Sequence, residues 1–325
     1  MCKKCLSCST NGQAGLRTAF FLTQGIPVTG SNTAGNLLAP FIENLYRMAW
    51  IVEARDPYTG GHLWRVSQYS RMLAEDLGLE ADEVARIELG GFLHDLGKVG
   101  IPDAVLNKPG PLDDHEYALI KTHPRIGARL LRGHPLAALA HEAVMMHHEM
   151  PDGRGYPQGL SGEGIPLIAR IVGICDAFDA MTSTRPYRKG MPVEKALSII
   201  QEAAGRQFDA DLSARLVRLG SVGKLNHLVG HTDHGIPLMS CPMCGPTIVV
   251  RRDQKPGDYV YCHQCGNQAR FKFRTDEAIE LEPTGAKGSA DQLETEVDEA
   301  LLSALVAGAH QHLAPRYKGL LDGAR

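Results

Sequence analysis

The chain has 325 residues, a formal net charge of −3 and a hydrophobic content of 43%. This length can bury a sizeable core in one large domain with appendages or in two domains, and the nearly neutral charge argues against a protein that binds nucleic acid over its whole surface. The sequence has no run of about 18 apolar residues and no apolar segment typical of a signal peptide after its N-terminus. We therefore expect a cytoplasmic protein without a membrane span.

Residues 1–40 mix Gly, Ser, Thr and Asn without a sustained period, which predicts an N-terminal extension or linker. Cys2, Cys5 and Cys8 are spaced as in zinc or iron–sulfur sites, but they would need a fourth ligand. A frayed terminus with reactive thiols is the favoured interpretation.

A helical pattern begins at Phe41, where apolar residues recur every three to four positions. A second helix is expected from near Gly61 to Gly78, whose glycine suits the position after a helix end. Asp82 is the expected N-cap of the next helix, and Asp113, with a glutamate three residues on, predicts a capping box. The region 41–219 is therefore predicted to be an all-α bundle.

Pairs of adjacent metal-binding side chains stand out in this region: His94-Asp95 and His147-His148. Such pairs can direct several N and O donors to one place, as two divalent metals require. Neighbouring helical residues project about 100° apart, so His94 and Asp95 cannot bind one ion in the same way but can straddle two. Asp95 is thus a candidate bridging carboxylate.

The stretch from Phe41 to Leu219 resembles the HD-GYP family, the bacterial cyclic di-GMP phosphodiesterases within the HD phosphohydrolases. The resemblance covers a little over half of the chain, and its motifs follow the family's order. These motifs are Asp56-Pro-Tyr58-Thr-Gly-Gly-His62, His94-Asp95, Gly100-Ile-Pro-Asp103, Lys108-Pro-Gly110, Lys121-Thr-His-Pro124, His147-His148, Asp152-Gly-Arg-Gly-Tyr156-Pro157, Asp176 and Thr184-Arg185-Pro-Tyr-Arg188.

The resemblance implies two metal ligand groups joined by Asp95: His62, His94 and Asp176 in the first ligand group, and His123, His147 and His148 in the second ligand group. Mixed imidazole and carboxylate ligands with open positions suit iron or manganese. Some family members hold a third metal with a glutamate four residues before the first histidine. Tyr58 occupies that position here, so we expect two metals.

The implied reaction is hydrolysis of cyclic di-GMP to linear pGpG by a hydroxide activated between two metals, with further hydrolysis to GMP left open. Lys98 is the candidate to contact the scissile phosphate and assist the leaving oxygen; a surface lysine at a helix end is the alternative. Arg185 and Arg188 match phosphate-contacting positions of the family, although either could pair with a carboxylate. The loop Gly155-Tyr156-Pro157 is expected to form a wall beside the metals and the substrate, or else a tight turn without function.

Beyond residue 219 the pattern changes. Two Cys-x-x-Cys motifs, Cys241/Cys244 and Cys262/Cys265, are separated by 17 residues and fit a structural Cys₄ zinc site. Short β-like runs at 247–250, 259–261 and 269–273 accompany them, so the segment 236–275 resembles a zinc ribbon. Its role as a structural clip, a protein-docking module or a nucleic-acid or nucleotide sensor stays open, because residues 241–274 carry six basic against two acidic residues.

The last segment, 276–325, begins with nine acidic residues against one lysine up to Leu301, which opposes nucleic-acid binding nearby. Apolar spacing predicts an amphipathic helix from Leu293 to His312. The whole chain is thus predicted to be an HD-type helical bundle with a small β-rich zinc ribbon and a C-terminal helix. Rival functions are hydrolysis of another cyclic dinucleotide or nucleotide, and a non-catalytic adapter that binds proteins through the ribbon or the Gly-Tyr-Pro loop.

Overall fold

A computed structural model of the chain describes residues 38–55, 60–108, 110–184, 189–243, 245, 247–274, 279–294 and 297–322. Several expectations fall outside the described residues: those for the N-terminal segment with Cys2, Cys5 and Cys8, and those for Tyr58, Arg185, Arg188 and Cys244. None of the described helices combines the length and the apolar composition that crossing a bilayer requires.

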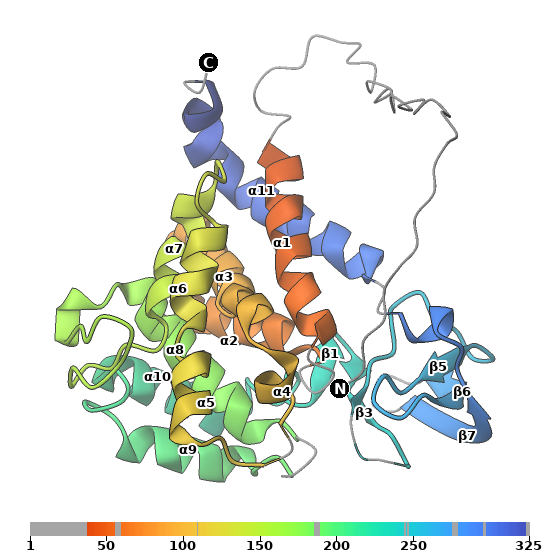
Figure 1. The fold of residues 1–325 in the computed structure, drawn as a ribbon. Helices are drawn as coiled ribbons and strands as arrows, with labels where there is room; N and C mark the ends of the chain where they lie inside the picture. The colour runs from red at the N-terminus through yellow and green to blue at the C-terminus, as the bar shows by residue number, and fades with distance from the viewer. Residues whose placement is uncertain are drawn as a thin grey trace, which may run out of the picture. The chain divides into compact units, whose positions relative to one another are not determined.

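The described part of the chain is mostly helical (Figure 1). Its α-helices are α1 (Leu38–Arg55), α2 (His62–Asp76), α3 (Ala81–Leu93), α4 (Asp103–Leu106), α5 (Asp114–Ile120), α6 (His123–Leu130), α7 (Ala137–Met146), α8 (Leu167–Thr182), α9 (Val193–Glu202), α10 (Ala210–Ser221) and α11 (Glu299–Asp322). Short 3₁₀ helices are η2 (Leu96–Gly100), η3 (Gly162–Gly164) and η4 (Asp291–Leu293).

The ends of several helices follow from local sequence. Gly78 has a φ of 73° directly after the last residues of α2, as predicted for a glycine past a helix end. The capping box of Asp113 and Glu116 at the start of α5 is also confirmed. The prediction of Asp82 as the N-cap of α3 was wrong, because the extended residue before the helix is Glu80 and Asp82 lies in the first turn. An acidic side chain there still favours the positive helix end.

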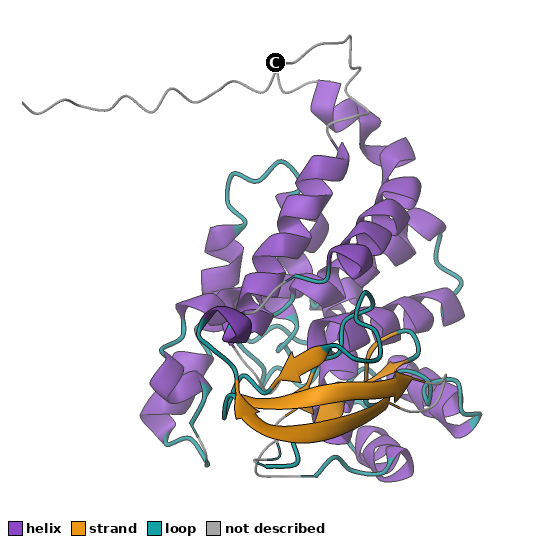
Figure 2. Ribbon diagram, turned by 90° about the vertical axis from the view of Figure 1, so that its right-hand side faces the viewer, coloured by secondary structure: helices purple, strands orange, loops and turns teal. Residues whose placement is uncertain are grey.

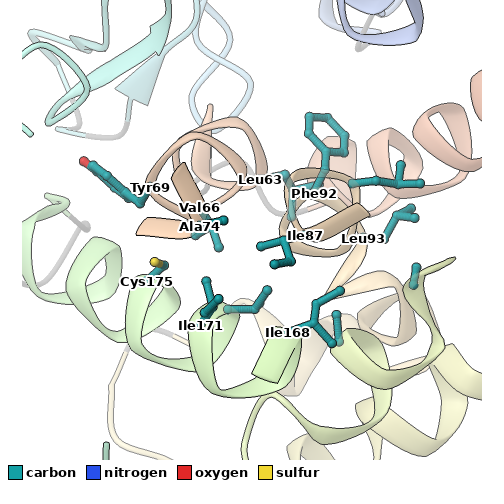
Figure 3. Close-up of a cluster of buried hydrophobic side chains, with 14 of the residues drawn as sticks. Leu63, Val66, Tyr69, Ala74, Ile87, Phe92, Leu93, Ile168, Ile171 and Cys175 are labelled. Carbon is teal, nitrogen blue, oxygen red and sulfur yellow. The ribbon is translucent and has the colours of Figure 1, made fainter. Parts of the chain in front are cut away.

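The main core lies among α2, α3 and α8 (Figure 3). Val66 of α2, Ile87 of α3 and Ile171 of α8 direct their side chains toward one another, and Tyr69 and Cys175 lie at one side of this cluster. Each of these residues is fully buried. Cys175 is thus a small, fully buried core residue. These helices also position predicted ligand residues: His62 begins α2, His94 follows α3, and Asp176 lies within α8.

The C-terminal helix α11 belongs to the same core, packing beside α1 and α3 (Figure 1). Leu302 and Leu313 are 1% and 0% exposed. The helix begins six residues later than predicted because the Asp298 carboxylate accepts the backbone N–H of Leu301 and so caps the helix there.

In the part of the chain that the structure describes, the strands lie between residues 231 and 287 and form small antiparallel sheets (Figure 2). Two pairs, β1 (His231–Asp233) with β2 (Ile236–Pro237) and β3 (Met239–Ser240) with β4 (Thr247–Ile248), precede the three-stranded sheet of β5 (Tyr259–Tyr261), β6 (Asn267–Arg274) and β7 (Ile279–Lys287). Each predicted β-like run contains a strand. A separate small core, which includes Val260 and Phe271, supports these strands.

Candidate metal centre

The first ligand group comes together from three separate helices. His62 is the first residue of α2, His94 directly follows α3, and Asp176 lies within α8. One ligand atom of each lies within 4.8 Å of the others. His62 and His94 are buried, and the Asp176 side chain is 20% exposed. The fold thus joins residues that are more than a hundred positions apart in sequence.

The second ligand group is built from α6 and the end of α7. His123 opens α6, and His147 and His148 follow α7. Their ligand atoms also lie within 4.8 Å of one another. The Nε2 atoms of His123 and His147 are 3.2 Å apart.

Asp95 lies between the two ligand groups. Its Oδ2 is 3.5 Å from His62 Nε2 and 3.3 Å from His94 Nε2. Its Oδ1 is 3.5 Å from His123 Nε2. Each carboxylate oxygen therefore faces a different group, which is the arrangement that a bridging ligand needs.

The histidine tautomers fit a metal site. The Nδ1 atoms of His94, His123 and His147 lie 2.7, 2.8 and 2.9 Å from the backbone carbonyl oxygens of Gly91, Ile120 and Ala143. A carbonyl only accepts, so each Nδ1 carries a proton and each ring turns its Nε2 toward the centre. Burial lowers the pKa of His123 and His147, so these two rings are neutral and their Nε2 atoms offer lone pairs.

Two observations show that these Nε2 atoms need a partner at the centre. Among the described residues, His94 Nε2 is buried without a hydrogen bond. The two Nε2 lone pairs of His123 and His147 point at each other over 3.2 Å, which is unfavourable unless a cation or a proton accepts them. The donor set therefore fits divalent cations.

Charge differs sharply between the groups when no metal is present. Burial lowers the pKa of His123 to about 4 and the pKa of His148 to about 3. Burial also lowers the pKa of His94, but the Asp95 and Asp176 carboxylates outweigh it and raise that pKa to about 10. The carboxylates thus favour the protonated form of His94 in the first ligand group, whereas burial keeps the imidazoles of His123 and His148 in the second ligand group neutral.

Lys98 lies beside the bridging carboxylate. It belongs to η2, its side chain is 21% exposed, and its Nζ is 2.5 Å from Asp95 Oδ2. Although burial opposes ionisation, Lys98 and His94 hold the pKa of Asp95 well below its usual range. The lysine is thus at the metal centre and not on an open surface.

The Gly-Tyr-Pro loop packs against the second ligand group. The Tyr156 ring stacks on the His148 ring with centroids 4.7 Å apart, and the Tyr156 backbone N–H donates to the His148 carbonyl. The Glu149 carboxylate closes the loop by accepting the backbone N–H groups of Gln158 and Leu160. Tyr156 therefore forms one wall of the centre.

Sequence reasoning missed two buried residues behind His62. The Asp179 carboxylate is 2.8 Å from His62 Nδ1, and Arg65 donates to both oxygens of that carboxylate. Asp179 lies three residues after Asp176 on α8, so both carboxylates share one helix face. That spacing was the signal that could have revealed Asp179.

The remaining predicted cluster is the cysteine group. Cys241, Cys262 and Cys265 have sulfur atoms within 4.8 Å of one another. Cys241 Sγ and Cys265 Sγ are 3.7 Å apart. Cys241 and Cys262 belong to the small core of the strand region, and Cys265 packs against it.

A sequence profile described as the HD domain matches residues 47–212, slightly more than half of the chain. The chain belongs to the HD domain family. All the described ligand residues of both groups lie inside the matched HD domain, whereas the cysteine group and α11 lie outside it.

Curated relatives of this HD domain protein include cyclic-dinucleotide phosphodiesterases. The cyclic di-GMP phosphodiesterase response regulator RpfG of Xanthomonas campestris is 45% identical over 178 residues, which cover 54% of this chain and 47% of the relative. A 3'3'-cGAMP-specific phosphodiesterase 3 of Vibrio cholerae is 39% identical over 167 residues, 51% of this chain and 36% of the relative. The chain thus spans about half or less of these relatives' length.

Among solved structures, a cyclic GMP-AMP-specific phosphodiesterase of V. cholerae aligns with a TM-score of 0.42 and 22% identity, covering 56% of this chain and 50% of the other.

Proposed function

We propose that this protein is a metal-dependent phosphodiesterase that hydrolyses a cyclic dinucleotide, with cyclic di-GMP as the first candidate. The observation that carries the proposal is Asp95, whose two oxygens face separate groups of histidines. Relatives named as cyclic di-GMP phosphodiesterases support the substrate class.

In this proposal the two ligand groups, with Asp95 between them, would hold two divalent metals, iron or manganese. Bound metals would lower the pKa of a water and neutralise charge on the phosphate. The protein contributes the fixed Nε2 lone pairs, the buried carboxylates and the ammonium group of Lys98. We infer that Lys98 contacts the scissile phosphate and stabilises charge on the leaving 3′ oxygen.

The remaining substrate contacts are proposed at three places. Arg185 and Arg188 would bind phosphate through their forked donors. The loop Gly155-Tyr156-Pro157 would line the substrate beside the second ligand group, where Tyr156 already stacks on His148. Tyr58, a neutral phenol at ordinary pH, supports a count of two metals and not three.

Product analysis tests the proposal. The full chain, purified without oxygen and supplied with Fe²⁺ or Mn²⁺, is incubated with cyclic di-GMP, and the products are resolved as pGpG and GMP. Asp95→Asn should abolish turnover and lower the bound metal, because the amide cannot bridge two cations. Asp114→Asn, an exposed acid in the first turn of α5, is the matched control and should retain activity. Undiminished hydrolysis by pure Asp95→Asn protein would contradict the mechanism.

A second substrate, 3'3'-cGAMP, is favoured by relatives named for that molecule. The same assay with both cyclic dinucleotides at equal concentration separates the candidates by kcat/KM. A protein that binds metal but hydrolyses neither substrate would support the adapter alternative.

We also infer that Cys241, Cys244, Cys262 and Cys265 hold one structural zinc in a ribbon at 236–275, separate from a catalytic domain at 41–219. Thiolates favour zinc, and three of the four sulfurs are within 4.8 Å of one another. Elemental analysis should find one zinc fewer in Cys262→Ser than in wild type. Met243→Ser, a change at an exposed position of the same motif, should retain the zinc; equal zinc in Cys262→Ser would rule the site out.

A further inference from the structure

Arg65 occupies a position that joins distant parts of the chain. It lies in α2, one turn after His62, and its side chain is almost fully buried. Its Nε and Nη2 donate to the two oxygens of Asp179 at 2.6 and 3.0 Å, and Nη2 also donates to Ser183 Oγ. A buried guanidinium with this many partners has very little orientational freedom.

The Asp179 carboxylate passes this constraint to the first ligand group. Its Oδ2 lies 2.8 Å from His62 Nδ1 and accepts the ring proton when Nε2 faces the metal centre. A carboxylate behind a ligand histidine fixes the ring's tautomer and orientation and raises the basicity of the other nitrogen. Arg65 therefore controls the orientation of His62 through one intervening side chain.

The third nitrogen of Arg65 has partners other than Asp179. Its Nη1 donates to the carbonyl of Gly60 at 2.9 Å and to the carbonyl of His231, the first residue of β1, at 2.7 Å. His231 lies beyond the HD domain match, which ends at residue 212. One guanidinium thus connects the strand region to the metal centre.

β1 is positioned by contacts that do not involve the metal ligands. The buried Asp233 carboxylate accepts two hydrogen bonds from Arg252, from Nε at 2.6 Å and from Nη2 at 2.7 Å. On its other side, β1 touches the start of α2 so closely that a Cβ on Gly61 would lie 2.5 Å from Thr232 Cα. A displacement of β1 therefore acts directly on α2.

β1 also has room to move. A cavity of about 400 Å³ borders Gly60, Gly61, Thr232 and Asp233. Loss of the Asp233–Arg252 pair would leave a buried carboxylate without its cation, which favours a shift of β1 toward water.

We propose that Arg65 is a positioning residue that makes the metal affinity of the first ligand group depend on the placement of β1. The inference rests on the proposed metal site. If Arg65 only neutralised the charge of Asp179, its hydrogen bond to the His231 carbonyl would not be needed. The bond to β1 brings the centre under the control of the strand region.

Cobalt titration of the full chain tests this dependence. Co²⁺ bound by nitrogen and oxygen ligands gives d–d absorption without the thiolate charge-transfer bands that report the cysteine group. Arg65→Lys keeps the charge, but a lysine cannot reach Asp179 and both carbonyls at once. The affinity for Co²⁺ at the histidine and aspartate ligands, called here the N/O site, should therefore fall by about 10- to 100-fold. Arg252→Gln, which leaves Arg65 and every ligand intact, should weaken the same binding step several-fold.

Lys255→Gln is the matched control, because it removes one positive charge from an exposed position of the strand region. Unchanged Co²⁺ affinity in this control together with weaker binding in Arg252→Gln supports the inference. Wild-type affinity in Arg252→Gln, or an equal loss in Lys255→Gln, overturns it even if Arg65→Lys is impaired. Absence of any N/O-bound cobalt in wild type overturns the proposed metal site itself and is seen before any variant is made.

Discussion

The same residue type plays opposite electrostatic roles at neighbouring positions of the metal centre. His94 and His123 both place Nδ1 on a backbone carbonyl and Nε2 at the centre. Yet the pKa of His94 is raised to about 10 and that of His123 is lowered to about 4, since only His94 has both Asp95 and Asp176 against its ring. Burial dominates at His123, whereas at His94 the adjacent Asp95 and the distant Asp176 outweigh burial.

Lys98 should contribute to turnover and not to metal retention. Lys98→Ala removes the ammonium 2.5 Å from Asp95 Oδ2, and kcat should fall on the order of 10²-fold as charge stabilisation at the phosphate is lost. Elemental analysis should find two metals in the N/O site as in wild type. The exposed Lys195→Ala is the control, and equal kcat in both variants would refute the role of Lys98.

His134 should make stability depend on pH away from the metal centre. Its ring packs edge-on against Phe41, and burial lowers its pKa below the usual value. The unfolded chain then binds the proton more readily, so the stabilising contribution is full above about pH 6.5 and declines as the pH falls through that value.

The test compares urea unfolding of wild type and His134→Asn between about pH 7.5 and pH 5.5. The asparagine Oδ1 can still accept the Leu136 backbone N–H, which the His134 Nδ1 accepts now, but it does not titrate. Wild type should lose more stability on acidification than the variant. Parallel losses would show that His134 contributes nothing to the pH dependence.

At the scale of elements, glycines allow the backbone to approach each histidine of the second ligand group. A Cβ on Gly97 would lie 1.8 Å from the His123 carbonyl oxygen, and one on Gly173 would lie 2.3 Å from that of His147. Likewise, a Cβ on Gly155 would lie 2.6 Å from the His148 carbonyl oxygen. The three elements η2, α8 and the Gly-Tyr-Pro loop thus hold the ligand backbones by direct contact.

Gly173→Ala should therefore destabilise the protein although alanine is the better helix former. The propensity gain is about 1 kcal/mol, but overpacking against the His147 backbone in the core should cost about 1–3 kcal/mol and displace a ligand. Gly308→Ala in α11, where nothing lies within 4 Å of the added Cβ, is the matched control and should stabilise slightly. Urea unfolding gives the free energy of unfolding of both variants, and elemental analysis gives their bound metal. A gain in stability for Gly173→Ala would refute the packing argument.

Local sequence predicted those features that depend on neighbours in the chain. The capping box at Asp113 and the glycine after α2 follow from chemistry within a few residues. The donor residues were also visible as motifs, and the fold brings them together. Arg65 escaped notice because its importance depends on a meeting between α2, α8 and β1 that no local pattern encodes. For Asp179, only its spacing from Asp176 on α8 offered a local signal.

At the scale of the molecule, α11 completes the core of the helices that carry the proposed metal centre. Leu302 lies 1% exposed among helices of the HD domain. Leu302→Ala should lower the free energy of unfolding by about 2–5 kcal/mol through lost burial and an unfilled cavity. Ser303→Ala, the exposed neighbour, should change it by less than about 0.5 kcal/mol. Equal stability of the two variants would show that α11 is not part of the cooperative unit.

The position of α11 in the chain has a consequence for synthesis on the ribosome. All the ligand residues of the proposed centre emerge before the strand region, and the helix that covers α1 and α3 emerges after it. Until then an apolar face of the nascent helical domain is open to chaperones and to other chains. The order of translation therefore leaves this part of the core uncovered until both the strand region and α11 have been made.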